Sequence, residues 1–304
     1  MGRDALTSRL LFYQERRENQ LEPNKCFDQF TQGLRAGLNS DAVQMSAVLR
    51  HVAKYRQHWR VDFQAEPGRH VVGRGIVDNT FAYGEPYPSP HYDAEVQILL
   101  YDTLAGWTDR PNTRVSQCLH DRFGLPWDAA LGRYQVEVSH DARHRATEYL
   151  FQRTGGCRTV AIHTQGDTAK HLKDLTDAQA MGICRTVRDL KRVPLVLGCM
   201  SGDAEVNCAV ISQCEAFVGI DSGPSKCASA TETPTLVVWT KHHPAKFHDP
   251  APNTTHLVPL DFNDFETVRG DAGIMTWFKA HYKVMGYQND PVPVIEKWLK
   301  EILR

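Results

Sequence analysis

The sequence predicts an α/β protein with two Rossmann-like domains, whose parallel sheets face a central cleft. A chain of 304 residues is too long for most single hydrophobic cores, so two domains of about 150 residues each are expected. Short apolar runs alternate with amphipathic segments, which is typical of parallel sheets covered by helices. We predict a first domain over residues 1–150, with residues 1–24 as an extension outside its core, and a second domain over residues 151–288. Residues 289–304 are expected to form a terminal helix that packs back near the first domain.

The first regular element of the first half is expected to be an amphipathic helix. Residues 42–57 place Val48, Leu49 and Val52 at helical spacing, with polar residues on the opposite side. Apolar runs bounded by glycine and proline predict strands after it, and two later segments predict helices. The strands are expected at 60–64, 79–83 and 95–101, and the helices at 113–123 and 139–153.

The second half alternates strand and helix more regularly. Its short apolar runs are rich in β-branched residues, and the segments between them have helical spacing. This rhythm predicts a parallel sheet with helices on both faces. Strands are expected at 158–163, 193–197, 216–220 and 235–239, and helices at 178–190, 206–214, 226–231 and 293–303.

The composition argues against several classes of protein. The 35 lysines and arginines nearly balance the 36 aspartates and glutamates, so the sequence does not indicate a protein that coats nucleic acid or an anionic membrane. The eight cysteines include no CxxC pair, which predicts reduced thiols and indicates neither zinc nor redox chemistry. The amino terminus has no apolar signal core, and the chain has no apolar run of about 18 residues. We therefore expect a cytoplasmic protein without stable membrane insertion.

Three loops at predicted strand ends or helix starts are the candidate ligand loops, because ligands of such sheets bind outside the carboxyl ends of the strands. They are residues 37–42, 163–168 and 221–224. In the last of these, Gly223 permits a close backbone approach, Pro224 suits a first helical position, and the following helix favours an anion at its start. An ordinary strand-to-helix connection capped by Asp or Ser is an equally open interpretation. No GxGxxG or Walker A motif accompanies the loops, which disfavours a dinucleotide oxidoreductase and a P-loop enzyme.

Each candidate loop belongs to a longer motif. Residues 38–50 combine an aspartate-bearing loop with a first helix, and residues 160–176 combine a strand, a glycine turn and lysines. Residues 217–239 combine a strand, an Asp-Ser-Gly turn, a helix of small residues and a further strand. In this order the three motifs resemble the heptosyltransferase-like glycosyltransferases, family 9 of the GT-B fold. The usual motifs of that family are Gly-Asp-x-(Val/Leu) in the first loop and Asp-Thr/Ser-Gly-x-x-His in the last.

The resemblance implies an inverting sugar transfer that needs no metal or other cofactor. The donor is a nucleotide-diphosphate sugar, by family default similar to ADP-heptose, and the acceptor is a hydroxyl. This chemistry needs a base for the acceptor proton and positive groups or N–H donors for the departing diphosphate. The resemblance implies Asp41 as the base, and the alternative role for this residue is to cap the helix that follows. The implied diphosphate partners are Lys173 or, as second choice, Lys170, with Ser222, Gly223, Pro224 and Lys226, and the implied donor loops contain Thr164, Gln165, Gly166 and Asp221.

Three departures from the family pattern keep alternatives open. Ser40 stands where the family has glycine before the aspartate, and Lys226 stands where it has histidine. Lysine can add charge near a phosphate but cannot shuttle a proton as histidine does. Residues 198–205 are shorter than the family's insertion that helps to hold the nucleotide base, so the identity of that base is open. The alternatives are another GT-B enzyme, such as a nucleotide-sugar 2-epimerase, and a sugar-nucleotide-binding protein that has lost catalysis.

The acceptor and the oligomeric state are also open. A lipopolysaccharide core, a small natural product and a modified polymer, including a nucleic-acid base, all stay candidates for the acceptor, although nucleic acid is not otherwise indicated as a partner. His242, His243 and His248 follow the last predicted strand, but no carboxylate lies at a convincing metal-ligand spacing from them. No metal site is predicted.

Overall fold

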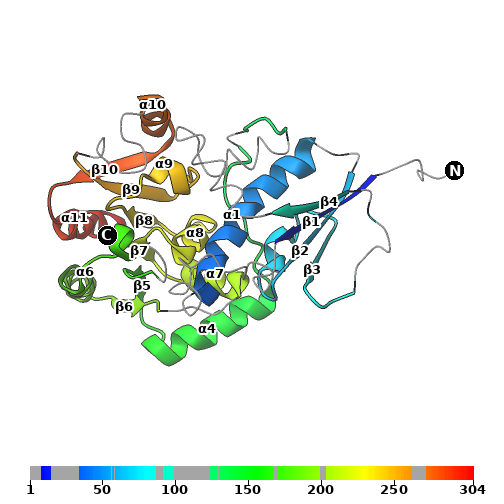
Figure 1. The fold of residues 1–304 in the computed structure, drawn as a ribbon. Coiled ribbons are helices and arrows are strands. Elements are labelled where there is room, and N and C mark those ends of the chain that lie inside the picture. Colours follow the sequence, from blue (N-terminus) through cyan, green and yellow to red (C-terminus); the bar gives the residue numbers. More distant parts are fainter. Residues whose placement is uncertain are drawn as a thin grey trace, which may run out of the picture.

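The structure of the chain is a computed structural model in which two parallel sheets stand side by side, with helices between them (Figure 1). It describes residues 8–14, 34–55, 57, 59–86, 92, 94–98, 124–128, 130–166, 170–198, 203–261 and 272–304. The helix predicted at residues 113–123 lies outside this described part. The two-sheet α/β architecture predicted from the sequence is present.

The first sheet has four parallel strands in the order β3-β2-β1-β4. These strands are β1 (Ser8–Gln14), β2 (Trp59–Ala65), β3 (Asn79–Ala82) and β4 (Ala94–Ile98). Because β1 lies between β2 and β4, the prediction that residues 1–24 form an extension outside the core is wrong for residues 8–14. The apolar run from Leu10 to Phe12 is short and stands in a polar context, yet an inner strand of a parallel sheet is where such a run belongs.

Helix α1 (Leu34–Tyr55) follows β1 and is longer than predicted. It includes residues 37–42, so the prediction of a loop there is wrong. Residues 34–38 contain Leu, Arg and Ala, which favour helix and allow it to extend toward the amino terminus. Val48, Leu49 and Val52 are fully or almost fully buried, as their helical spacing predicted. A short 3-10 helix, η2 (His70–Gly73), lies between β2 and β3.

The second sheet has six parallel strands in the order β10-β9-β8-β7-β5-β6. They are β5 (Thr159–His163), β6 (Val193–Val196), β7 (Ala216–Ile220), β8 (Thr235–Val238), β9 (Thr254–Pro259) and β10 (Lys283–Tyr287). The helices of this half are α5 (Lys170–Lys173), α6 (Asp177–Asp189), α7 (Ala204–Ser212), α8 (Gly223–Ser229), α9 (Pro244–Phe247), α10 (Ala272–His281) and α11 (Val292–Ile302). Each strand and helix predicted in this half is present, whereas α5, α9, α10, β9 and β10 were not predicted.

Helices cover both faces of the second sheet. Val160 and Ile162 of β5 share one apolar core with α6 and α11, while Ala161 between them belongs to another core with α7 and α8. This alternation is the two-residue period of a strand that is buried on both faces. The C-terminal helix α11 buries Ile295, Trp298 and Leu299 in the core of the second sheet. In the described part of the chain its apolar stripe packs against α6 and β7. The expectation that this helix packs back near the first domain is therefore wrong for the described residues.

The two halves share a core. Helix α1 packs against α8, and α4 (His140–Thr154), which was predicted at the end of the first half, packs against α7. Buried residues of α1, β2, α4, α7 and α8 form one continuous apolar cluster. Figure 1 shows α1, α7 and α8 between the two sheets. The first sheet precedes residue 150 and the second follows it, but buried residues from both halves belong to this one cluster.

A buried carboxylate adds a polar clamp between the halves. Glu205, at the start of α7, receives a hydrogen bond from the Arg74 guanidinium at 2.9 Å and another from the backbone N–H of Ser139. Next to it, the backbone N–H of Ala204 donates to the carbonyl oxygen of Gly68 at 2.9 Å. The clamp thus joins the segment after β2, the start of α4 and the start of α7.

We call residues 130–138, which precede α4, the crossover segment. Arg50 of α1 donates to its backbone carbonyl oxygens at Leu131 (3.4 Å) and Arg133 (3.1 Å), and the backbone N–H of Gln135 donates to Ser46 Oγ at 2.9 Å. These bonds fix the crossover segment along α1.

Candidate functional site

The candidate site lies at the carboxyl ends of β5 and β7 in the second sheet. The chain passes outward from β5 to β6 and returns to β7 on the other side of β5, so the strand order reverses between these two strands. Open α/β sheets bind their ligands outside the carboxyl ends of the strands at such a switch point. Because His163 is paired with Gly219, the loops that follow them are neighbours. The described parts of the predicted loops 163–168 and 221–224 are therefore brought together by the fold.

The turn after β7 leads directly into α8, as predicted. Ser222 has an extended backbone with φ −164°, and Pro224 lies in the first turn of the helix, where its missing N–H has no consequence. Ser225 Oγ accepts a hydrogen bond from the Ser222 N–H at 3.0 Å and donates to the Ser222 carbonyl oxygen at 2.8 Å. The Ser222 hydroxyl donates to the Ile220 carbonyl oxygen at 3.2 Å. The turn therefore has the capping bonds of an ordinary connection, and the Ser222 hydroxyl proton is already in use.

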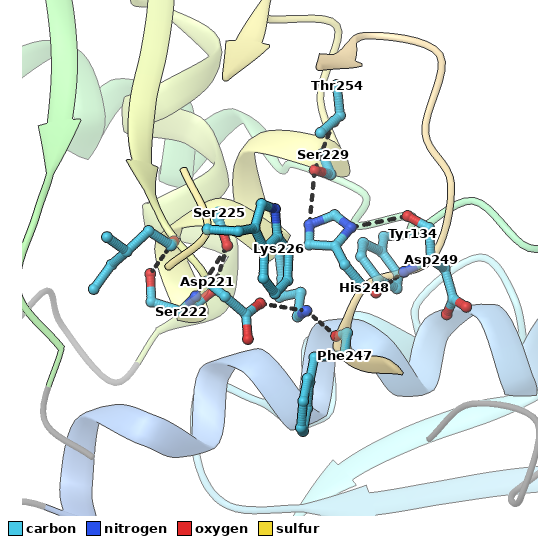
Figure 2. A network of polar contacts seen from close by, with 12 residues as sticks. Tyr134, Asp221, Ser222, Ser225, Lys226, Ser229, Phe247, His248, Asp249 and Thr254 are labelled. Carbon is cyan, nitrogen blue, oxygen red and sulfur yellow. Dashed lines mark hydrogen bonds and ion pairs between the residues drawn. The ribbon is translucent and has the colours of Figure 1, made fainter. Parts of the chain in front are cut away.

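Lys226 occupies a different position from the one expected of a diphosphate ligand. Its side chain is only 3% exposed, and its Nζ lies 2.8 Å from Asp221 Oδ1 and also donates to the carbonyl oxygen of Phe247 (Figure 2). Asp221, which was expected in a donor loop, is thus the ion-pair partner of a predicted diphosphate partner. Because the ammonium charge is neutralised inside the protein, we do not assign Lys226 to the diphosphate.

The predicted glycine turn after β5 is packed against Lys173. The backbone N–H of Gly166 donates to Asp174 Oδ1 at 2.8 Å. A side chain at position 166 would place its Cβ only 2.8 Å from Lys173 Cε and 3.3 Å from Lys173 Nζ. Glycine at this position therefore lets the lysine lie over the turn.

The other residues of this loop differ in exposure. Thr164 is buried and its carbonyl oxygen accepts the Leu175 N–H at 3.0 Å, while Gln165 is exposed and donates to Asp177 Oδ1 at 3.0 Å. Lys170, the second-choice phosphate partner, is exposed at the start of α5. Residues 167–169 lie outside the described part.

Asp41, the predicted base, lies within α1 rather than before it. The helix starts at Leu34, so Asp41 is not the residue that caps its amino terminus. Its side chain lies outside the described part of the chain. The backbone of Asp41 belongs to the N-terminal half of α1, a helix that packs against α8 and α7.

A buried polar cluster behind α8 was not predicted as a unit. Tyr134 of the crossover segment accepts the Asp249 N–H on its hydroxyl at 2.7 Å, and its ring centroid lies 5.9 Å from Lys226 Nζ. His248 makes hydrogen-bond contact with Ser229 Oγ at 3.3 Å (Figure 2). No signal in the sequence links Tyr134 to residues more than 90 positions away. The run from His242 to Asp249 was a visible polar signal, but it did not reveal which side chains face inward.

Burial sets the charge of the histidines in this cluster. Burial, followed by the positive charge of Lys226, lowers the pKa of His248 well below its usual value and lowers that of His256 to about 3. His256 Nδ1 accepts the Trp239 indole N–H at 3.0 Å, which also requires this nitrogen to be unprotonated. Both imidazoles are therefore neutral near pH 7.

The three histidines considered for metal binding have separate surroundings. His242 stacks on Phe247 with ring centroids 4.5 Å apart, and His243 Nδ1 accepts the Ala245 N–H at 3.1 Å. Within the residues that the structure describes, no three His, Cys, Asp or Glu side chains gather as a metal site. The same part of the chain contains no helix that is both long and apolar enough to cross a membrane.

One segment of the chain matches the model of a known protein family. Residues 203–269 match the model of glycosyltransferase family 9 (heptosyltransferase). The matched range covers α7, β7, the Asp-Ser-Gly turn, α8 and the segment that carries His248. No curated protein matches the chain.

Solved structures share the fold over most of the chain. A family 9 glycosyl transferase from Veillonella parvula superposes with a TM-score of 0.61 at 9% identity, covering 98% of this chain and 97% of that one. The iron-containing dodecameric glycosyltransferase TibC from enterotoxigenic E. coli superposes with a TM-score of 0.54 at 11% identity, covering 82% of this chain and 62% of that one. TibC in complex with ADP-D-beta-D-heptose gives a TM-score of 0.52 at 14% identity. At these identities the likenesses show the fold, which is GT-B.

Proposed function

We propose that this chain, a heptosyltransferase-like glycosyltransferase of the GT-B fold, transfers a sugar with inversion from a nucleotide-diphosphate sugar to an acceptor hydroxyl, without a metal. The observation that carries the proposal is the position of the Asp-Ser-Gly turn, which lies at the switch point of the second sheet and inside the range that matches family 9. The donor is an ADP-heptose-like nucleotide sugar in this proposal, which agrees with the ligand named for TibC.

The leaving diphosphate binds between the two neighbouring loops of the second half in this mechanism. Gly223 offers a backbone N–H at the start of α8, and Lys173, over the Gly166 turn, supplies positive charge. Hydrogen-bond donors and a cation held in place stabilise the charge that develops as the glycosidic bond breaks. A metal is then not needed to neutralise the diphosphate.

Asp41 of α1 acts as the base in this mechanism. Inversion requires the acceptor oxygen to attack the anomeric carbon on the face opposite the diphosphate, and a carboxylate on that side takes its proton. Helix α1 packs against α8, so it supplies residues on the side of the site that the first half provides. The acceptor is held mainly by the first half.

Donor binding is tested by thermal shift with ADP, UDP, GDP and their sugars. A ligand at 100 times its dissociation constant stabilises the protein by about 2.7 kcal/mol. Lys173→Ala should abolish the shift given by the best nucleotide, whereas Lys297→Ala, a change on the exposed side of α11, should retain it. No shift with any nucleotide would contradict the proposal.

Transfer is tested by turnover with a purified donor and candidate acceptors in the presence of EDTA. Asp41→Asn should reduce kcat by about 10²–10⁴-fold and leave donor binding intact, while Asp189→Asn, an exposed change at the end of α6, should leave kcat unchanged. Near-normal transfer by Asp41→Asn would rule out this base.

Donor binding without turnover by the unaltered protein would instead favour a non-catalytic sugar-nucleotide-binding protein. A changed sugar released without an acceptor would favour an epimerase. Loss of transfer in EDTA would contradict the metal-free mechanism.

A further inference from the structure

We propose that Lys226 is a positioning residue, which holds the Asp-Ser-Gly turn in the geometry that binds the donor. The inference rests on the proposed function, because it assigns how that same turn is held. Figure 2 shows the Lys226 ammonium group between the Asp221 carboxylate and the Phe247 carbonyl oxygen. Asp221 directly precedes Ser222 and Gly223 of the turn, so the ion pair is attached to the turn itself.

Lys226 joins three segments that are far apart in the sequence. Its Nζ contacts Asp221 after β7 at 2.8 Å and Phe247 at the end of α9, and it lies over the ring of Tyr134 from the crossover segment. Tyr134 continues the connection, because its hydroxyl accepts the Asp249 N–H at 2.7 Å. A single side chain thus connects the turn of the second half, the segment from Phe247 to Asp249, and a segment that α1 fixes.

The positive charge is required for this role, not merely the size of the side chain. Lys226 is 3% exposed and the Asp221 side chain is 12% exposed, so neither charge is stabilised mainly by water. Removing the ammonium group would leave the largely enclosed Asp221 carboxylate without this partner and the Phe247 carbonyl oxygen without this donor. The Asp221 side chain would then turn toward water, and the adjoining turn would lose its fixed position.

The position of the pair separates this role from that of a surface ion pair. Lys300 and Glu296 on α11 also form an ion pair, but their side chains are 54% and 43% exposed. Both residues are also distant in sequence from the turn. Exposed ion pairs of this kind contribute little to the stability of a protein. The Lys226–Asp221 pair is enclosed and adjoins the proposed donor site, so its loss should change donor binding as well as stability.

The test compares Lys226→Met, Asp221→Asn and the double variant with Lys297→Met as an exposed control. ADP, UDP and GDP binding is measured by calorimetry, and hydrogen exchange is measured for the backbone amides of Asp221, Ser222, Gly223 and Ser225 and of residues 247–249. We expect Lys226→Met to weaken binding of the best nucleotide at least tenfold and to speed exchange in both segments at least tenfold, with Lys297→Met unchanged. The double variant has no unpaired carboxylate and should therefore regain stability to urea, but not donor affinity. If Lys226→Met alone does not fold, the donor affinity of the double variant still tests the inference.

Each other outcome overturns the inference in a recognisable way. Unchanged exchange and unchanged affinity in Lys226→Met would show that the lysine does not hold the turn. Faster exchange with unchanged affinity, or recovery of both stability and affinity in the double variant, would show a purely structural ion pair. Absence of nucleotide binding by the unaltered protein would contradict the proposed function itself and, with it, the positioning role.

Discussion

His256 illustrates how burial and one hydrogen bond determine the charge of a single side chain. The imidazole is 1% exposed, its Nδ1 accepts the Trp239 indole N–H at 3.0 Å, and its pKa is lowered to about 3. In the unfolded chain the pKa of a histidine is about 6.5. Below that pH the unfolded chain therefore binds a proton that the folded protein does not accept.

This difference predicts a loss of stability in acid. The stability that neutral His256 contributes is fully present above about pH 6.5, declines by about 1.4 kcal/mol per pH unit as the pH falls, and is lost by about pH 3. Urea unfolding between pH 8 and pH 4 should show this slope, to which His248 contributes with the same sign. In His256→Gln the glutamine amide oxygen can still accept the Trp239 N–H. The slope of unfolding free energy against pH should be shallower in this variant, by up to about 1.4 kcal/mol per pH unit, which corresponds to one proton. His281→Gln, at an exposed histidine, should keep the original slope, and an unchanged slope in His256→Gln would contradict this account.

Residue-scale prediction from the sequence succeeded where a local motif determines the geometry. The Asp-Ser-Gly turn and the Gly166 turn beside Lys173 both lie at the carboxyl edge of the second sheet. The sequence could not predict that Lys226 points inward, because its partner at Phe247 is a backbone carbonyl and Tyr134 is distant in sequence. Contacts of this kind depend on tertiary packing, which no local pattern encodes.

At the scale of elements, β5 and β7 with their following turns show two different uses of glycine. A Cβ added at Gly166 would lie 2.8 Å from Lys173 Cε, which is near the end of a flexible side chain. Gly219 lies in buried β7, where an added Cβ would meet Phe217 Cζ at 2.6 Å and the His163 carbonyl oxygen at 2.8 Å. The Lys173 side chain can move away from an added Cβ. The His163 carbonyl oxygen cannot, because it belongs to the backbone of the paired strand β5.

Alanine at the two glycines should therefore separate function from stability. Gly166→Ala should change the free energy of unfolding by less than about 1 kcal/mol but weaken nucleotide binding, because Lys173 is displaced. Gly219→Ala should destabilise the protein by about 1–3 kcal/mol, because it overpacks the sheet. Urea unfolding and calorimetry measure the two effects. Equal stability losses in both variants would contradict the packing described for the Gly166 turn.

Elements were predictable where burial on both faces produced an unbroken apolar run, as in β5, β7 and β8. Strand β1 was missed because its apolar run is short and surrounded by polar residues, although it is an inner strand. The start of α1 was misplaced because Gly37, Asn39 and Ser40 are typical of turns, yet the structure continues the helix through them.

At the scale of the whole molecule, the Glu205 clamp joins the halves with charge as well as with apolar contact. Its side chain is 8% exposed and bonds to Arg74 and to the backbone of Ser139. Hydrogen bonds to a charged group contribute about 1.5–3 kcal/mol each, although the 40% exposure of Arg74 weakens its share.

Glu205→Gln should therefore destabilise the protein by about 1–3 kcal/mol while unfolding remains a single transition. Glu232→Gln removes the partner of Arg133 at a site where the Glu232 side chain is 90% exposed, so its effect should be within about 0.5 kcal/mol. Urea unfolding followed by tryptophan fluorescence and by circular dichroism measures both variants. Equal losses in the two variants would contradict the clamp, and two separate transitions in Glu205→Gln would contradict the shared apolar core.

Helix α1 contributes to the same apolar core as α7 and α8. The point near residue 150 that divides the sequence into two α/β repeats is therefore not a seam along which the folded protein can be separated. A fragment that ended there would expose the face of α1 that now meets α8, and the remaining fragment would expose α7 and α8. Each half covers apolar residues of the other half. Replacing one half by that of a relative would therefore also require the helix face that it packs against, on α1 or on α7 and α8, to be replaced.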